Sequence, residues 1–322
     1  NKYAGLAQDA VTQLGVDGIY MDQACSSLAC FDPTHGHPLG GGSYWMNGFR
    51  LLPADIRARC DGSRKVVLAG EGCGETWLPY LDVMLSLQVS MERYAAPGAW
   101  EPIPFFHAVY HGYGVFYGNY SSLAMPPYDD LWPPEFAPKE PLKTLDRKYA
   151  GQFRLEQARA FVWGQQPTIA NFREPQFEEC AEEIAYVLRL VKLRYGARKY
   201  LLYGTMLSTF ENTGIPALEV SGDPTDFSRL SIYAGQQEAI KEFQKKVPAV
   251  LASAWQAPDG DVAIVLVNVT DKPQSFTLTL DRVRYAIAEG CAITVRSADG
   301  KQVLGPATGN PVKLQVDLGP KD

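Results

Sequence analysis

Two short, mostly apolar runs that each end in an acidic residue constrain the fold of this chain more than any other feature. Residues 16–22 end at Asp22, and residues 65–71 end at Glu71. Such runs are typical of parallel strands that are buried on both faces of a sheet. A helix-like stretch at residues 45–60 separates them, which is the alternation of a β/α fold. The sequence therefore predicts a parallel sheet with carboxyl groups at the ends of neighbouring strands.

The same alternation continues through the first 246 residues. Further helices are predicted at residues 3–14, 78–90, 145–163 and 174–195, and further strands at residues 103–110 and 167–170. This makes four or five strands, whereas a complete (β/α)8 TIM-type barrel has eight. The fold class predicted for residues 1–246 is therefore α/β, as the C-terminal part of such a barrel.

The texture of the sequence changes near residue 247. Short strand-like runs follow one another, separated by turns rich in Gly, Pro and Asp. They occupy residues 250–255, 262–269, 275–280, 292–297 and 312–316. We expect residues 247–322 to form a small all-β sandwich domain.

The start of the chain suggests a piece of a longer polypeptide. It begins at Asn1, without Met, directly in an apolar helical repeat. We expect the absent barrel strands to precede Asn1, or a second chain to complete the barrel, because an incomplete barrel exposes sheet edges. The six cysteines show no CxxC spacing, and free thiols are favoured over a loop disulfide. Export or the periplasm is slightly favoured over the cytoplasm as the cellular location.

Composition excludes several classes of function. The 322 residues carry 30 Lys+Arg against 36 Asp+Glu, without a basic stripe, which argues against a nucleic-acid partner. No apolar run reaches the roughly 18 residues of a membrane span. The phosphate-binding motifs GxGxxG and GxxxxGK[ST] are absent, as is the GxSxG motif of serine hydrolases. Aromatic residues make up 11% of the chain, and such rings suit the faces of sugars.

The two terminal acids suit the hydrolysis of a glycosidic bond. Adjacent parallel strands lie about 4.8 Å apart, so that Asp22 and Glu71 can flank one bond. A short Asp in a polar setting suits the nucleophile, and a Glu in apolar surroundings suits the general acid/base. Glu75 is the alternative acid/base if the strand ends later. The structural alternative is that Asp22 caps the following loop and Glu71 pairs with an arginine such as Arg64.

Residues 15–23, with the sequence GVDGIYMDQ, resemble the fourth-strand segment that carries the catalytic Asp in barrel glycoside hydrolases. Residues 68–71, LAGE, resemble the fifth-strand segment that supplies the acid/base Glu. This order is similar to the α-amylase superclan, including endo-α-N-acetylgalactosaminidase-like enzymes. Residues 105–112 and 161–167 extend the resemblance to uncharacterised large bacterial glycosidase-like proteins with a barrel and a C-terminal sandwich. The resemblance implies retention of configuration and an α-linked substrate.

Other side chains are candidates for binding the substrate. His35 and His37 stand in a Gly-rich loop after the Asp22 strand, where they could hydrogen-bond sugar hydroxyls. The H-x-H spacing also admits a metal, but no third cluster of ligands accompanies it, so we expect neither a metal nor a cofactor. The remaining candidates for substrate binding are Trp77, His107, Tyr110 and His111.

The sequence thus predicts a retaining glycoside hydrolase that acts on an oligosaccharide or glycoconjugate, with no nucleic-acid or membrane partner. One rival is an inverting hydrolase or a transglycosidase that uses the same acids. The other rival is a non-catalytic carbohydrate-binding or scaffold protein with a degenerate glycosidase barrel.

Overall fold

The chain forms two compact units in the computed structural model. The structure describes residues 2–25, 29–62, 65–86, 103–119, 121–125, 143–209, 225–231 and 241–321. Unit 1 comprises Asn1–Ser86 and Tyr113–Tyr117, and unit 2 comprises Leu87–Gly112 and Gly118–Asp322. No helix within the described ranges has both the length and the apolar character that a membrane span requires.

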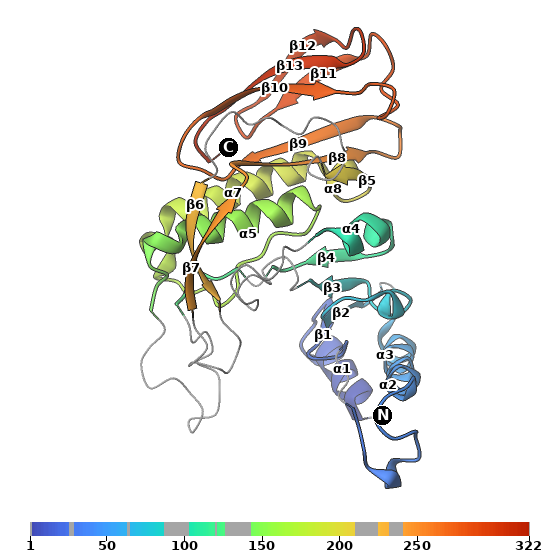
Figure 1. The fold of residues 1–322 in the computed structure, drawn as a ribbon. Helices are drawn as coiled ribbons and strands as arrows, with labels where there is room; N and C mark the ends of the chain where they lie inside the picture. The colour runs from blue at the N-terminus through green and yellow to red at the C-terminus, as the bar shows by residue number, and fades with distance from the viewer. Residues whose placement is uncertain are drawn as a thin grey trace. The chain divides into compact units, whose positions relative to one another are not determined.

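A four-stranded parallel sheet is the centre of unit 1 (Figure 1). Its strands follow chain order: β1 (Gly18–Met21), β2 (Val67–Glu71), β3 (Val83–Leu85) and β4 (Val115–Tyr117). Parallel neighbours in sequential order are the arrangement of a singly wound barrel wall. The two acid-terminated runs therefore form adjacent parallel strands, as the sequence predicts.

Unit 1 also contains helices α1 (Lys2–Gln13), α2 (Tyr44–Phe49) and α3 (Leu51–Cys60), together with the 3-10 turns η1 (Pro33–His35) and η2 (Glu75–Trp77). Arg57 of α3 donates to the Val66 carbonyl oxygen at 3.1 Å and to Asp82 Oδ2 at 2.8 Å. Asp82 Oδ2 also accepts the Leu68 N–H at 2.8 Å. This network holds α3 against β2 and the start of β3. The predicted helices at residues 3–14 and 45–60 are confirmed, the second with a break at Arg50.

The prediction of a helix over residues 78–90 is wrong for its described part. Residues 78–80 form a turn, and β3 follows; residues 87–90 lie outside the described ranges. The reason is tertiary pairing, because β3 hydrogen-bonds to β2 on one side and to β4 on the other. This pairing buries Met84 completely and overrides the local helical pattern.

The predicted strand at residues 103–110 is also wrong. The structure has helix α4 (Phe105–Tyr110), followed by the turn η4 (His111–Tyr113). The Ala108 N–H donates to the Pro104 carbonyl oxygen at 2.8 Å, which begins the helix. His107 and His111 are both buried, and their spacing of four residues is a helical period. Residues 167–170 contribute only the isolated bridge between Ser122 and Ala170.

In the described part of unit 2, helices come first along the chain and β-strands follow. After the turn η5 (Arg147–Tyr149) come α5 (Ala150–Val162), α6 (Gln176–Glu179), α7 (Ala181–Gly196) and α8 (Arg198–Leu201). Strand β5 (Thr205–Thr209) pairs with β8 (Val250–Gln256), which pairs with β9 (Val262–Asn268). A separate hairpin consists of β6 (Thr225–Ser231) and β7 (Lys241–Val247). The long helices predicted at residues 145–163 and 174–195 are confirmed in their main parts.

The last strands form a β-sandwich with the β5–β8–β9 sheet (Figure 1). Strand β10 (Gln274–Leu280) pairs with β13 (Val312–Leu318), and β11 (Ala292–Arg296) pairs with β12 (Lys301–Pro306). Phe276 and Leu278 of β10 pack with Val250 and Ala252 of β8 in one apolar core. All five strands predicted from the sequence are present, and β12 was missed. Strand β5 pairs with β8 across the predicted boundary between residues 246 and 247, and that boundary remains a prediction.

Candidate active site

The register of β1 and β2 brings Asp22 and Glu71 to one place in unit 1. Met21 lies opposite Gly70 in the ladder, so Asp22 follows one step later beside Glu71, the last residue of β2. Burial raises the pKa of the Glu71 carboxyl, and the charge of Asp22 and a hydrogen bond with it raise this pKa further. The site therefore pairs an exposed carboxylate with a half-buried carboxyl that holds its proton more firmly than usual.

The turn after Asp22 also reaches Glu71. The Gln23 backbone N–H donates to Glu71 Oε2 at 3.0 Å, and this bond opposes the rise in the Glu71 pKa. Gln23 has a φ of 50°, which is uncommon for a residue other than glycine. Such backbone strain concentrates at functional sites, where the surrounding structure maintains it. The hydrogen bond from this turn connects the end of β1 to the end of β2.

Two tyrosines border the carboxyl pair, and the sequence analysis did not select either of them. The Tyr20 hydroxyl donates to Asp22 Oδ1 at 3.4 Å. Burial raises the pKa of Tyr20, and Glu71 and Asp22 add to that rise. Burial also raises the pKa of Tyr117, at the end of β4, and the negative charge of Glu71 raises it further. Tyr20 precedes Asp22 by two residues, so the period of a strand puts them on one face, which is the signal that was available.

Two cysteines also lie near the pair. Burial raises the pKa of the Cys25 thiol to about 12, with smaller contributions from Cys73 and Glu71. Cys73 Sγ lies 3.9 Å from the Ser86 hydroxyl oxygen. Neither cysteine forms a disulfide, in agreement with the sequence-based preference for thiols, and the Cys25 thiol, held protonated in this way, is a poor nucleophile.

The loop after β1 gathers three side chains that can ligate metals. Cys30 Sγ lies 3.2 Å from His35 Nδ1, and one ligand atom each of Cys30, His35 and His37 lies within 4.8 Å of the others. Cys30 and Gly40 form an antiparallel bridge, which closes the loop. The H-x-H spacing alone does not reveal Cys30 as a third ligand, because the bridge to Gly40 brings Cys30 back to the pair.

Glu75 and Trp77 both belong to η2, four and six residues after Glu71. Glu75 is exposed and is the first residue of the turn. Trp77 is 9% exposed, and its ring meets the Phe49 ring edge-on with centroids 4.9 Å apart. This packing accounts for Trp77 as a core residue of unit 1, and its role as a stacking platform for a sugar remains a prediction.

His107, Tyr110 and His111 belong to unit 2. Burial lowers the pKa of His107 to about 3 and that of His111 to about 4, so both rings are neutral at physiological pH. The Gln165 amide nitrogen lies 2.6 Å from His107 Nε2, and the His111 ring packs edge-on against Trp255. These contacts account for the two histidines as core residues of unit 2. Tyr110 is partly exposed, and the substrate-binding role of all three remains a prediction.

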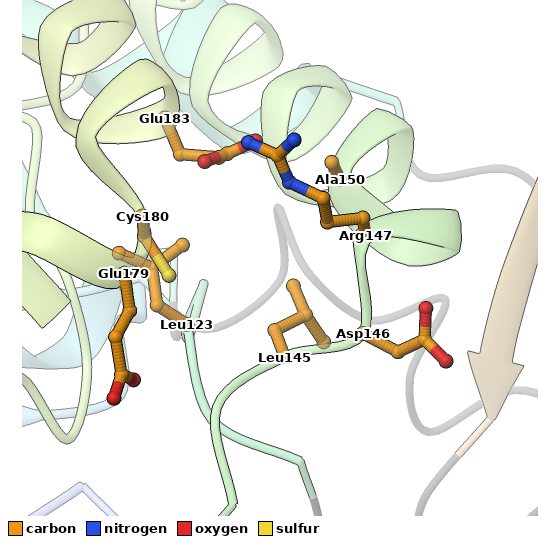
Figure 2. Close-up of a pocket in the computed structure, with 8 residues that line it drawn as sticks. All are labelled: Leu123, Leu145, Asp146, Arg147, Ala150, Glu179, Cys180 and Glu183. Atoms are coloured by element: carbon orange, nitrogen blue, oxygen red, sulfur yellow. The ribbon is translucent and has the colours of Figure 1, made fainter.

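A small pocket of unit 2 lies between η5 and the first turns of α7 (Figure 2). Arg147 extends toward Glu183 across it, and the Cys180 sulfur points inward (Figure 2). Burial raises the pKa of Cys180 to about 11, so that its thiol is not a nucleophile at neutral pH. The volume of about 10 Å³ admits about one water molecule and no sugar.

Two family models match parts of the chain. Residues 1–121, which carry the carboxyl pair, match a domain of unknown function, DUF6259. Residues 239–300 match the glycosyl hydrolase family 30 beta sandwich domain. The second match agrees with the sandwich that β8 to β13 form.

Known proteins are similar over most of the chain. A protein from Bacteroides thetaiotaomicron, named as a candidate glycoside hydrolase, is 21% identical over 279 residues, or 85% of this chain and 34% of that protein. A maltogenic α-amylase from Thermotoga neapolitana has a similar structure, with a TM-score of 0.51 and 13% identity over 100% of this chain and 63% of the amylase. The chain thus spans about a third of its curated relative. It is glycoside hydrolase-like, with an α/β region followed by a β-sandwich.

Proposed function

We propose that this chain carries the catalytic centre of a retaining glycoside hydrolase, with Asp22 as the nucleophile and Glu71 as the general acid/base. The observation that supports this most is the pairing itself. Two carboxyl groups meet at adjacent strand ends, and the raised pKa of one of them favours its protonated form. A glycosidase requires one ionised and one protonated carboxyl on either side of the scissile bond.

Each group then has a defined task. Protonated Glu71 gives its proton to the leaving oxygen, while the Asp22 carboxylate attacks the anomeric carbon and forms a glycosyl-enzyme. Glu71, now ionised, takes a proton from water, and that water releases the sugar. Tyr20 steadies Asp22 by its hydrogen bond at 3.4 Å. Strands about 4.8 Å apart favour retention, which needs a carboxyl separation of about 5–5.5 Å, over inversion, which needs about 6.5–9.5 Å.

The preference for an α-linked oligosaccharide or glycoconjugate is a finer proposal. It is supported by the order of the two acids along the chain and by the maltogenic α-amylase among the similar structures. We further propose that a preceding segment or a second chain completes the barrel, because four parallel strands are described in unit 1. His35 and His37 follow the Asp22 strand, and a contact of their ring nitrogens with substrate hydroxyls remains a prediction that excludes metal binding by the same nitrogens.

A panel of aryl α- and β-glycosides, tested on the longest natural form of the protein, examines this proposal. We expect hydrolysis of α-glycosides, its loss in Asp22→Asn, and a loss of about 10²–10⁴-fold in Glu71→Gln. Glu75→Gln is the matched control and should keep its activity. If Glu75→Gln were inactive and Glu71→Gln active, Glu75 would be the acid instead.

The anomeric form of the first product separates retention from inversion, and NMR of that product measures it. A product of inverted configuration would show that the same two acids catalyse a single displacement and not the proposed double displacement. If the protein bound sugars without hydrolysing them, and Asp22→Asn bound them equally well, the non-catalytic rival would be supported and the proposal overturned.

A further inference from the structure

The loop between β1 and α2 holds Cys30, His35 and His37 close together although no chemistry of the proposed active site uses their mutual contact. Cys30 Sγ and His35 Nδ1 are 3.2 Å apart. A tetrahedral zinc ion, with bonds of about 2.3 Å to sulfur and about 2.0–2.1 Å to nitrogen, separates its ligand atoms by about 3.6 Å. Small side-chain movements therefore convert this cluster into a coordination shell.

The contacts of the two histidine rings select the nitrogens that would bind. His35 Nε2 lies 3.2 Å from Asp32 Oδ2, which leaves Nδ1 to face Cys30. His37 Nδ1 lies 2.8 Å from the Pro38 carbonyl oxygen, and a proton on Nδ1 leaves the Nε2 lone pair for a ligand. A metal-binding histidine almost always donates its second N–H to a carboxylate or a backbone carbonyl in this way.

Asp32 is itself held in place as an acceptor. Its Oδ1 accepts from the Thr34 backbone N–H at 2.8 Å and from the Thr34 hydroxyl at 2.6 Å. Its Oδ2 lies 3.2 Å from His35 Nε2. Because Thr34 occupies Oδ1 and His35 occupies Oδ2, Asp32 orients the His35 ring from outside the coordination shell.

We propose that Cys30 Sγ, His35 Nδ1 and His37 Nε2 bind one zinc ion, with water in the fourth position. One thiolate and two imidazoles suit a borderline-soft ion such as Zn²⁺ far better than the hard ions Mg²⁺ or Ca²⁺. Cys30 and His37 are partly exposed and His35 is exposed, which leaves room for the water ligand. The His37 ring also stacks on Tyr44, the first residue of α2, with centroids 3.9 Å apart. The ion would thus fix the loop against α2.

Titration of the metal-free full chain with Co²⁺, followed by competition with Zn²⁺, tests the site. We expect a thiolate-to-cobalt charge-transfer band that saturates at one ion per chain and disappears when Zn²⁺ displaces the cobalt. Cys30→Ser should abolish the band, and His35→Ala and His37→Ala should each weaken Zn²⁺ binding by at least about tenfold. Asp32→Asn should weaken it by about 10–100-fold.

Cys60→Ser is the matched control, because Cys60 is a partly exposed thiol of unit 1 at the end of α3. It should bind cobalt like the unchanged protein, and far-UV circular dichroism should show that every variant is folded. Absence of the band at saturating Co²⁺ would overturn the proposal. A band that persists in Cys30→Ser, or that is lost in Cys60→Ser, would do the same, because another thiol would then be the ligand.

Discussion

At the scale of single residues, two carboxyl groups at neighbouring positions differ because their surroundings differ. Glu71 is half-buried, and burial together with the nearby Asp22 charge raises its pKa. Asp22 is exposed and accepts a hydrogen bond from Tyr20. A difference of this kind is what the proposed division into an acid and a nucleophile requires.

The raised pKa of Glu71 has a consequence for stability. Because the native state binds this proton more tightly than the unfolded state, the contribution of Glu71 is fully present below its ordinary pKa of 4.5 and is lost as the pH rises through the native pKa. Glu71→Gln removes the charge, so we expect it to unfold at a higher temperature than the unchanged protein at pH 7. The difference in melting temperature between the variant and the unchanged protein should disappear as the pH falls toward 4.5.

Thermal melts from pH 4 to pH 8 measure this difference. Glu75→Gln provides the comparison, since Glu75 is an exposed carboxyl of the adjacent turn. An equal pH-dependent gain in Glu75→Gln would show that the effect does not come from the carboxyl pair.

Tyr20→Phe tests the hydrogen bond to Asp22. The bond is long, at 3.4 Å, and Tyr20 is 47% exposed, so we expect a loss of about 1 kcal/mol of transition-state stabilisation. That loss corresponds to about a fivefold lower kcat/KM on the best aryl glycoside. Tyr3→Phe, on the exposed side of α1, is the control. An unchanged kcat/KM in Tyr20→Phe would show that the Tyr20 hydroxyl does not contribute to the reaction.

At the scale of elements, the approach of β1 to β2 determines whether the two acids meet. Gly18 lies opposite Val67, and a Cβ atom at Gly18 would lie 2.9 Å from the Val67 carbonyl oxygen. Backbone atoms cannot give way as a flexible side chain can. The absence of a side chain at Gly18 therefore permits the register that brings Asp22 beside Glu71.

We expect Gly18→Ala to destabilise the protein by about 1–3 kcal/mol, as overpacking typically does. Gly5→Ala is the matched control, because Gly5 lies within helix α1 and its added Cβ would meet no atom within 4 Å. It should stabilise the protein by roughly 0.5–1 kcal/mol through the higher helix propensity of alanine. Chemical denaturation measures both. Equal effects of the two substitutions would contradict the close approach of β1 and β2.

At the scale of the whole molecule, β8 joins the helices of unit 2 to the β-sandwich. Its buried residues alternate between two cores, with Ala252 and Ala254 in the sandwich core and Leu251 and Trp255 in the helical core. Ser253 Oγ and Trp255 Nε1 both donate to the Val162 carbonyl oxygen at the end of α5, at 2.7 and 3.2 Å. The β5–β8–β9 sheet is therefore a middle layer that serves both cores.

A fragment that ends at residue 246 tests the predicted domain boundary. It would lack β8 and β9, which supply Trp255, Val267 and Leu251 to the helical core. We expect this fragment to lose cooperative unfolding and near-UV circular dichroism, because α5 would expose the face that β8 covers. A soluble fragment with a sharp thermal transition would show instead that residues 1–246 fold as an independent domain.

Much of the architecture was predictable because it follows from local pattern. The apolar runs that end at Asp22 and Glu71 became adjacent parallel strands, and the regular turns after residue 247 separated the strands of the sandwich. The wrong helix at residues 78–90 has a tertiary origin. Residues 83–85 form β3 because β2 and β4 lie on either side, and no local signal reports such neighbours.

The sequence by itself determined two strands that each end in an acid and the succession of strands in the sandwich, because an apolar run and the residue that ends it are recorded in consecutive residues. Only the tertiary structure decided which side chains surround those acids. Tyr117 joins the pair from β4, and Cys30 joins His35 and His37 through the bridge to Gly40. Contacts between residues far apart in the chain depend on strand register and loop closure, which are set by the packing of the whole unit.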